Sequence, residues 1–428
     1  MNARPITPAA RPVRGTIRPP GSRSLTNRAL IVAALADGDS DLTDVGLSDD
    51  TRVCAEALRV LGIGVRTDEA ACRMRVAGCS GRVPPGPREI HTGDSGTATR
   101  FMTALVAAGT GHYRVDGSPR MRERPIQDLL SGLAMLGVTA ESEAGTGCPP
   151  VRIETSGLAG GKVVLSGAVS SQYLSAILMA APAAAGPIRL EVAGELVSKP
   201  FVDMTLAVMR EFGVAVSHEG YSRYDVPAPQ RYGARAYRVE PDAASARYFL
   251  AAAAATGGRV TVEGLTRASA QGDAHFAEVL RAMGCGVEWA PGGVTVTGPQ
   301  RLSGIRIDLN GMPDMVLTLA PLALLARGRT VIENVANLRV KESDRLKALA
   351  TELGRLGARV EEHPDGLTIC PPETVQAAEV QVYSDHRMAM GLAIVGLAAP
   401  GIRIASPECV AKTYPRFFED LEALVKAP

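Results

Sequence analysis

Basic residues recur where apolar helices are predicted to begin, and a few carboxylates lie among them. The basic residues are Arg23, Arg28, Arg124, Lys341, Arg345, Arg387 and Lys412. The interleaved carboxylates are Asp50, Asp314 and Glu342. Several cations brought to one place would bind a polyanionic ligand through charge-assisted contacts to phosphate or carboxylate groups. The carboxylates and Lys341 could then transfer protons within such a site.

The predicted helices share one pattern, in which small polar or charged residues precede a long apolar run. Examples are SRSLTNRALIVAALADG, SGTATRFMTALVAAG, SSQYLSAILMAAPAAAG, PDMVLTLAPLALLARG and DHRMAMGLAIVGLAAPG. A helix that is apolar on nearly all faces is buried, so its polar start must face something other than the core. Helix N-termini attract anions through unpaired N–H groups and partial positive charge. Ordinary N-capping explains any one of these starts, but it does not explain the arginines that accompany several of them.

A second pattern recurs at intervals of 71 to 76 residues, in which a helix-like stretch ends at a glycine and a strand-like run follows. The glycines are Gly62, Gly137, Gly213, Gly284 and Gly357. Glycine commonly follows a helix because it tolerates positive φ. Chance recurrence of helix–glycine–strand junctions is the alternative, but the regular interval favours duplicated α/β units. The interval corresponds to six units over 428 residues.

Composition narrows the class of protein. The length predicts two domains, and the 46 basic and 45 acidic residues argue against a protein that binds nucleic acid or a membrane surface. The seven cysteines include no CxxC pair and no metal-type spacing, which favours a reducing cytoplasm over a disulfide framework. No apolar segment near the N-terminus is typical of a signal peptide, and the most apolar windows are too short to span a bilayer.

Eleven segments resemble, in order, the motifs of the 5-enolpyruvylshikimate-3-phosphate (EPSP) synthase family. They include PGSRSLTNRALIVAALADG, GDSGTATR, SSQYLSAILMAAP, NLRVKESDRL and AKTYP. The full set covers residues 20–38, 47–52, 93–100, 120–126, 170–182, 196–206, 239–254, 312–323, 337–346, 384–398 and 411–415. Any one segment would be weak, but their common order over nearly the whole chain is specific.

This resemblance implies the fold. It is an α/β architecture, a two-domain inside-out α/β barrel made of six repeated βαβαββ units, three per domain. The implied N-terminal domain, residues 22–239, holds the acceptor and part of the phosphoenolpyruvate (PEP) site. The implied C-terminal domain, residues 1–21 plus 240–428, holds further PEP-binding and catalytic residues. The active site is expected in the cleft between the domains, which would close when the acceptor binds.

The resemblance also implies the reaction. The enolpyruvyl group of PEP is transferred to the 5-hydroxyl of shikimate 3-phosphate, and phosphate is released. Side chains would supply the acid, the base and the electrostatic stabilisation, with no cofactor and no metal. The expected partners are these two small molecules, with no nucleic acid and no membrane, and the expected form is a cytoplasmic monomer.

Site residues are carried over position by position from the matching motifs. The resemblance implies that Asp314 is the base, that Glu342 moves a proton at the PEP carbon, and that Lys341 and Arg23 are also catalytic. The implied acceptor-binding residues are Ser24, Arg28, Ser170, Ser171, Gln172, Ser198, Phe201, Asp314, Asn337 and Lys341. The implied PEP-binding residues are Arg23, Asp94, Gly96, Thr97, Arg124, Gln172, Arg345, His386, Arg387 and Lys412, with Asp50 as a further contact on the PEP side.

Three positions depart from the family pattern. Arg23 stands in place of lysine, Asp94 in place of asparagine, and Phe201 in place of tyrosine. A guanidinium keeps the charge of lysine but cannot release a proton near neutral pH. An ionised Asp94 would repel PEP unless it is paired. We therefore hypothesise that Arg23 pairs with Asp94 and that the two changes compensate each other.

These departures leave two alternatives to an ordinary EPSP synthase. One is a diverged paralogue that acts on a related acceptor or with altered PEP chemistry. The other is a non-catalytic ligand-binding homologue, against which the retained Asp314, Lys341 and Glu342 argue. The sibling family, UDP-N-acetylglucosamine enolpyruvyl transferase, is disfavoured because the loop GSPRMRERP around Arg120 lacks a cysteine.

Overall fold

The computed structural model describes residues 3–168 and 170–427. Residues 1–2, 169 and 428, which the predicted domain ranges also contain, lie outside the described residues. The chain divides into two compact units. The N-terminal unit is Gly21–Val239, and the C-terminal unit is Met1–Pro20 together with Glu240–Pro428.

The N-terminal unit contains three four-stranded sheets, in the orders β14-β3-β5-β4, β6-β7-β9-β8 and β10-β11-β13-β12. Its helices are α1 (Arg23–Leu35), α2 (Asp49–Leu61), α3 (Gly96–Ala107), α4 (Gln127–Ala134), α5 (Ser171–Ala180) and α6 (Pro200–Glu211). Its strands are β3 (Asp39–Thr43), β4 (Val65–Asp68), β5 (Arg73–Ala77), β6 (Arg88–His91), β7 (Gly111–Asp116), β8 (Thr139–Ser142), β9 (Val151–Thr155), β10 (Gly161–Ser166), β11 (Ile188–Ala193), β12 (Ser217–Glu219), β13 (Arg223–Val226) and β14 (Ala236–Arg238).

The C-terminal unit contains the sheets β16-β17-β15-β2, β19-β21-β23-β22 and β1-β25-β24, and the short pair β18-β20. Its helices are α7 (Ala243–Thr256), α8 (Phe276–Ala282), α9 (Val316–Ala323), α10 (Arg345–Arg355), α11 (His386–Ala398) and α12 (Phe417–Lys426). Its strands are β1 (Ala3–Pro5), β2 (Arg14–Ile17), β15 (Arg259–Glu263), β16 (Gly286–Ala290), β17 (Gly293–Thr297), β18 (Leu302–Ser303), β19 (Arg306–Asp308), β20 (Ala326–Arg327), β21 (Thr330–Glu333), β22 (Arg359–His363), β23 (Gly366–Cys370), β24 (Ala378–Val380) and β25 (Ile402–Ala405). Short 3-10 turns include η3 (Gly272–His275), η4 (Pro313–Met315), η5 (Ala336–Val340) and η6 (Pro407–Lys412).

One motif underlies both units. In the series β6-α3-β7-α4-β8-β9, a helix links two parallel strands, a second helix follows, and two antiparallel strands complete the sheet. The five glycines singled out above each follow the second helix of a motif, and all have positive φ, between 84° and 101°. A strand follows each of these glycines. The inside-out α/β fold with six repeated units is confirmed.

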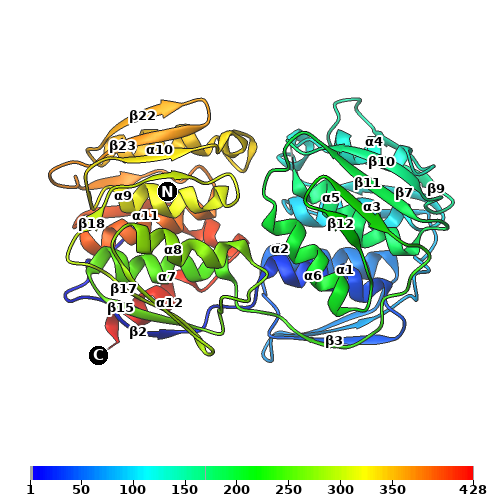
Figure 1. Ribbon diagram of the computed structural model, residues 1–428, viewed down its shortest axis with the longest axis horizontal. Coiled ribbons are helices and arrows are strands. Elements are labelled where there is room, and N and C mark those ends of the chain that lie inside the picture. Colours follow the sequence, from blue (N-terminus) through cyan, green and yellow to red (C-terminus); the bar gives the residue numbers. More distant parts are fainter. Residues whose placement is uncertain (1–2, 169, 428) are drawn as a thin grey trace. The chain divides into compact units, whose positions relative to one another are not determined.

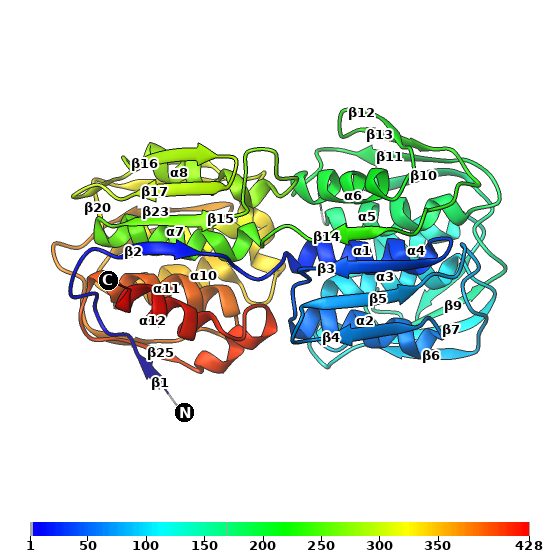
Figure 2. The same ribbon diagram turned by 90° about the horizontal axis from the view of Figure 1, so that it is seen from below.

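The two helices of each motif differ in burial, as the apolar runs predict. The helices α1, α3 and α5 of the N-terminal unit, and α7, α9 and α11 of the C-terminal unit, are buried along almost their whole length. In the C-terminal unit, strands lie on both sides of the helices (Figures 1 and 2). In the described part of the chain, no helix combines the length and apolar character needed to cross a bilayer.

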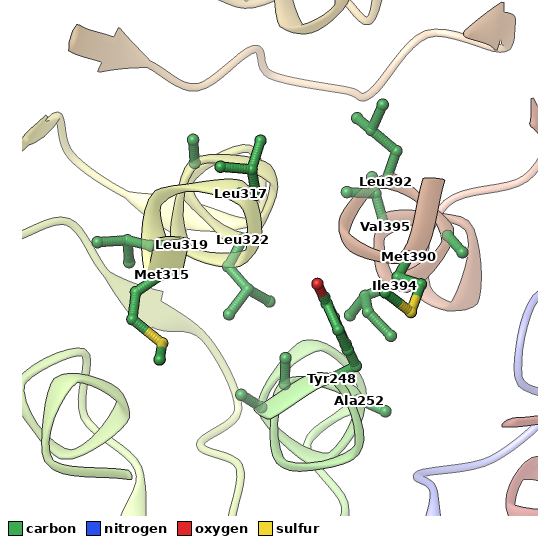
Figure 3. Close-up of a cluster of buried hydrophobic side chains, with 14 of the residues drawn as sticks. Tyr248, Ala252, Met315, Leu317, Leu319, Leu322, Met390, Leu392, Ile394 and Val395 are labelled. Atoms are coloured by element: carbon green, nitrogen blue, oxygen red, sulfur yellow. The ribbon is translucent and has the colours of Figure 1, made fainter. Parts of the chain in front are cut away.

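The core of the C-terminal unit forms where α7, α9 and α11 pack together. Figure 3 shows Tyr248 of α7 next to Leu322 of α9 and Ile394 of α11. The approach of α11 to α9 requires a glycine, because a Cβ built on Gly391 would lie 1.8 Å from the carbonyl oxygen of Leu317. These helices carry site residues at their N-terminal ends, so their spacing also fixes the spacing of those residues.

We expect Gly391→Ala to lower the free energy of unfolding of the C-terminal unit by about 2 kcal/mol or more, because the helices must separate. The single tryptophan, Trp289 on β16, allows denaturant unfolding of this unit to be followed by fluorescence. Gly354→Ala is the matched control, since no heavy atom lies within 4 Å of its added Cβ. The control should be neutral or stabilise α10 by up to about 1 kcal/mol. Equal effects of the two substitutions would contradict the close helix contact.

Candidate functional site

A buried arginine organises the polar end of the C-terminal unit. Arg345, at the start of α10, has a side chain only 1% exposed. Its guanidinium lies 2.7 Å from Asp314 on η4, 2.8 Å from Glu342 and 2.7 Å from Asp385, the N-cap of α11. One cation therefore joins three carboxylates from three separate segments. Removing a single partner from such a buried cluster leaves an uncompensated charge and strongly destabilises the folded state.

Asp314 lies between two arginines. One carboxylate oxygen is 2.7 Å from Arg345 and the other is 2.9 Å from Arg387. Burial of Asp314 opposes its ionisation, but the charges of Arg387, Arg345 and Lys341 outweigh burial and hold its pKa well below the usual range. Asp314 is therefore a carboxylate at neutral pH and can accept a proton.

Two of the remaining predicted residues of this unit, Lys412 and Lys341, interact with the same cluster. Lys412, at the end of η6, is 3.3 Å from Glu342. Lys341 follows η5 and contributes to the positive potential at Asp314. His386 is buried in the first turn of α11. Asn337 lies on η5, and its buried Oδ1 has no hydrogen-bond partner among the described residues.

The structure shows a further buried ion pair in this unit. The fully buried Arg247 of α7 lies 3.5 Å from Asp273 on η3. Burial raises the pKa of Asp273 to about 6, although the charges of Arg247 and Arg387 oppose this shift. Arg247 also donates to the hydroxyl of Tyr248 over 2.7 Å. We did not predict this pair, although an arginine inside an alanine-rich buried helix was a signal that could have found it.

In the N-terminal unit, Arg28 is a buried cation without a carboxylate. Its guanidinium donates to the Thr205 hydroxyl at 2.7 Å and to the carbonyl oxygens of Ser24 and Phe201, both at 2.9 Å. No carboxylate of the described residues forms an ion pair with it. Burial lowers the pKa of Arg28 to about 9. An anionic ligand would supply the missing negative charge.

The polar residues around α5 and α6 belong to the same unit. Ser170 caps α5 by accepting a hydrogen bond from the amide of Gln172, and Ser171 is buried next to it. The Gln172 side chain donates to the hydroxyl of Thr97 at 3.3 Å. Ser198, just before α6, is buried and has φ of 57°, in the left-handed region that non-glycine residues rarely adopt. This segment is therefore held in an unfavourable conformation beside the helix start.

A pair of cations without carboxylate partners in the described part of the chain lies at the start of α3. A Cβ built on Gly96 would lie 2.8 Å from the Arg100 guanidinium and 2.9 Å from that of Arg124, so a side chain here would require these guanidiniums to shift. Burial lowers the pKa of Arg100 to about 10, and the nearby charge of Arg124 contributes to the shift. Neither arginine forms an ion pair with a carboxylate of the described residues. Two adjacent cations at a helix N-terminus are suited to an anion.

The hypothesis that Arg23 pairs with Asp94 is wrong. Arg23 instead pairs with Asp50 in the first turn of α2, at 2.7 Å, and both side chains are largely buried. Asp94 accepts a hydrogen bond from the hydroxyl of Ser118. The two residues have separate partners, because α1 packs against α2, whereas Asp94 lies against Ser118 in the turn after β7. The departures at positions 23 and 94 are therefore not a compensating contact.

Within residues 3–168 and 170–427, no group of three or more His, Cys, Asp or Glu side chains is arranged to hold a metal ion. All seven cysteines are free thiols. The site consists of arginines, lysines, carboxylates and hydroxyls. These groups can bind anions and move protons.

Known proteins with similar sequences identify the family. Residues 8–421 match the model of the EPSP synthase (3-phosphoshikimate 1-carboxyvinyltransferase) family. A chloroplastic 3-phosphoshikimate 1-carboxyvinyltransferase of Arabidopsis thaliana is 48% identical, over 97% of this chain and 83% of its own. The chain belongs to the EPSP synthase family. A 3-phosphoshikimate 1-carboxyvinyltransferase of Nostoc punctiforme is 47% identical, over 96% of this chain and 97% of its own.

The fold agrees with this EPSP synthase membership. A solved EPSP synthase of Acinetobacter baumannii aligns with a TM-score of 0.84 over 99% of this chain and 98% of that chain, at 24% identity. The two proteins therefore share the six-unit architecture. The predicted membership of the EPSP synthase family is confirmed.

The Arg247–Asp273 pair of this EPSP synthase family member makes stability depend on pH. A carboxyl whose pKa is raised by folding stabilises the folded state at low pH and loses that contribution as pH rises through its folded pKa. Between pH 4 and 7, we expect wild type to lose about 2–3 kcal/mol relative to Asp273→Asn, which does not titrate. Unfolding followed by Trp289 fluorescence at several pH values measures the difference. A pH-independent difference would contradict the raised pKa.

Proposed function

We propose that this protein is a 3-phosphoshikimate 1-carboxyvinyltransferase. It transfers the enolpyruvyl group of PEP to the 5-hydroxyl of shikimate 3-phosphate and releases phosphate. The observation that carries the proposal is the near full-length identity of 44–48% with relatives that bear this name. The buried cations that lack an internal carboxylate, Arg28 and Arg100, support a substrate pair rich in phosphate and carboxylate groups.

The proposed binding roles follow the charge of each group. Arg124, Arg345, Arg387 and Lys412 bind the phosphate and carboxylate of PEP, with Gly96 leaving room for the ligand. Arg28 and Ser24 hold the ring carboxylate of the acceptor. The remaining proposed acceptor contacts are Ser170, Ser171, Ser198 and Asn337 at its phosphate, and Gln172 against its ring. The absence of an internal counter-ion for Arg28 supports the second role, because a carboxylate would offset the burial of its charge.

The reaction requires proton transfer in each of its two steps. The acceptor hydroxyl loses a proton as its oxygen adds to C2 of PEP, and C3 gains a proton. Asp314 is the proposed base, and Glu342 with Lys341 delivers the proton to C3. In the second step C3 returns a proton, the bond between C2 and the phosphate oxygen breaks, and EPSP and phosphate are formed.

The ion pairs of the C-terminal unit suggest how Asp314 becomes an effective base. Arg345 and Arg387 hold its pKa low while they face only protein carboxylates. When the phosphate and carboxylate of PEP accept hydrogen bonds from these arginines, the positive potential at Asp314 falls. Its pKa then rises, so its affinity for a proton increases when substrate is present.

Phosphate release tests the proposal. PEP with shikimate 3-phosphate should release phosphate, whereas PEP with shikimate should release far less. Asp314→Asn should lower kcat by about 10²-fold or more, because the base is lost. Glu373→Gln is a control that removes an exposed carboxylate elsewhere in the same unit. Turnover only with another hydroxylated acid would indicate a diverged paralogue, and acceptor binding without turnover a non-catalytic homologue.

The contacts of Arg23 can be tested with double-mutant cycles on kcat/KM for PEP. Arg23→Gln with Asp50→Asn should show a coupling of about 1–3 kcal/mol, because the side chains are 2.7 Å apart. Arg23→Gln with Asp94→Asn should show a coupling below about 0.5 kcal/mol, because Asp94 bonds to Ser118. The reverse order of couplings would restore the rejected pairing.

We further propose that the protein acts as a monomer in the cytoplasm, without a nucleic-acid or membrane partner. Of the large apolar side chains that are exposed among the described residues, Val60, Val164 and Val340 come from separate elements, and Met135 lies against Val164. Monomers commonly carry such scattered residues. Sedimentation velocity at micromolar concentration should give one species near 44.7 kDa. A dimer would contradict the proposal.

A further inference from the structure

A buried carboxylate outside the proposed mechanism lies on the same helix as Arg345. Glu352 of α10 is fully buried, with 0% of its surface exposed. It follows Arg345 by seven residues, which is two helical turns, so both side chains leave the same face of α10. That face is in contact with the segment 381–385, which links β24 to α11.

Both oxygens of Glu352 accept hydrogen bonds from this segment. Oε1 accepts from the hydroxyl of Tyr383 at 2.8 Å, and Oε2 accepts from the amide of Gln381 at 3.0 Å. The third donor is Arg355, at 3.1 Å from Oε2, whose side chain is 48% exposed. Burial and the hydrogen bond to Glu352 raise the pKa of Tyr383 to about 12, so its hydroxyl remains a donor.

The segment has an unusual backbone conformation. Tyr383 and Ser384 are consecutive and have φ of 54° and 55°, in a region that residues with side chains rarely adopt. The next residue is Asp385, whose amide donates to the carbonyl oxygen of Val382 at 2.8 Å. Such a conformation persists only when surrounding contacts hold it. The two hydrogen bonds to Glu352 are contacts of this kind.

The far end of the same segment enters the proposed site. The Asp385 carboxylate accepts from the Arg345 side chain at 2.7 Å and from the amide of Arg387 at 3.0 Å. Helix α10 therefore holds the segment at both ends, through Glu352 on Gln381 and Tyr383 and through Arg345 on Asp385. Any relaxation at Tyr383 would be passed directly to the start of α11.

We propose that Glu352 is a positioning residue for PEP binding, because it holds residues 381–385 in the conformation that places Asp385 and Arg387. This inference rests on the proposed function, in which Arg345 and Arg387 bind PEP. Glu352 itself does not touch substrate. It acts through the backbone of the segment and the N-terminus of α11.

Two variants weaken the hydrogen bonds between Glu352 and residues 381–385, and a third variant serves as a control. Tyr383→Phe deletes one hydroxyl from a side chain that is 44% exposed, so the fold should be retained. Glu352→Gln keeps the shape but places an amide donor among hydrogen-bond donors. Arg355→Gln removes the third donor without touching the segment.

We expect KM for PEP to rise about 5-fold in Tyr383→Phe and 10-fold or more in Glu352→Gln, a loss of about 1–1.4 kcal/mol. KM for shikimate 3-phosphate should stay within 2-fold, and the control should match wild type.

A second measurement separates this proposal from the proposed function. Amide hydrogen exchange of residues 382–389 in the full chain should accelerate about 10-fold in Glu352→Gln and remain unchanged in Arg355→Gln. This result is independent of turnover, so it decides the positioning role even when wild type proves inactive with shikimate 3-phosphate. Ser384→Gly should restore part of the PEP affinity of Glu352→Gln, because glycine adopts positive φ readily.

The proposal is overturned when Glu352→Gln and Tyr383→Phe lower only the midpoint of Trp289-monitored unfolding. In that case KM for PEP and the exchange of residues 382–389 would both equal the values of Arg355→Gln. Glu352 would then stabilise the unit without positioning the site.

Discussion

The buried guanidinium of Arg345 is the interaction on which the C-terminal unit depends. It joins Asp314, Glu342 and Asp385, which come from η4, from the segment before α10 and from the N-cap of α11. Three acids around one cation would carry excess negative charge, and Arg387 and Lys412 offset it by pairing with Asp314 and Glu342. Ion pairs between these residues fix the positions of the helix N-termini, and apolar packing fixes the rest of each helix.

In the N-terminal unit, two buried arginines lack carboxylate partners among the described residues. Arg28 and Arg100 are buried and are neutralised by no carboxylate of the described residues; their guanidiniums donate mainly to carbonyl and hydroxyl oxygens. These acceptors satisfy most of the N–H groups, although the buried Nε of Arg100 has no partner among the described residues, and they do not balance the charge. The C-terminal unit therefore pairs Arg345 and Arg387 with acids, whereas in the N-terminal unit Arg23 is paired with Asp50 but Arg28 and Arg100 have no carboxylate partner among the described residues. An anion that approached Arg345 or Arg387 would compete with protein carboxylates, whereas Arg28 and Arg100 have no such carboxylate to displace.

Much of the fold could be predicted from the sequence, but few of the ion-pair and hydrogen-bond partners of the charged residues could. Gly62 and its four equivalents mark helix ends because positive φ is a local property of the chain. The cations near helix starts could also be predicted, because the sequence itself shows which residues precede each apolar run. The partner of Arg23 was predicted wrongly, since Asp50 and Asp94 both lie near helix starts and only packing of α1 on α2 decides between them. Glu352 was missed because an isolated glutamate on an amphipathic helix is normally solvated, and its burial depends on a segment thirty residues away.

The position of the first two strands has a consequence for biosynthesis. β1 pairs with β25, and β2 pairs with β15, so residues 3–17 complete sheets whose other strands come after position 259. The N-terminal unit is continuous from Gly21 to Val239, so all of its strands are synthesised before the partner strands of β1 and β2. At ordinary rates of translation, β1 waits on the order of 20–80 s for its partner. Strands β1 and β2 are therefore synthesised before the N-terminal unit, but they can complete their sheets only after it has been made.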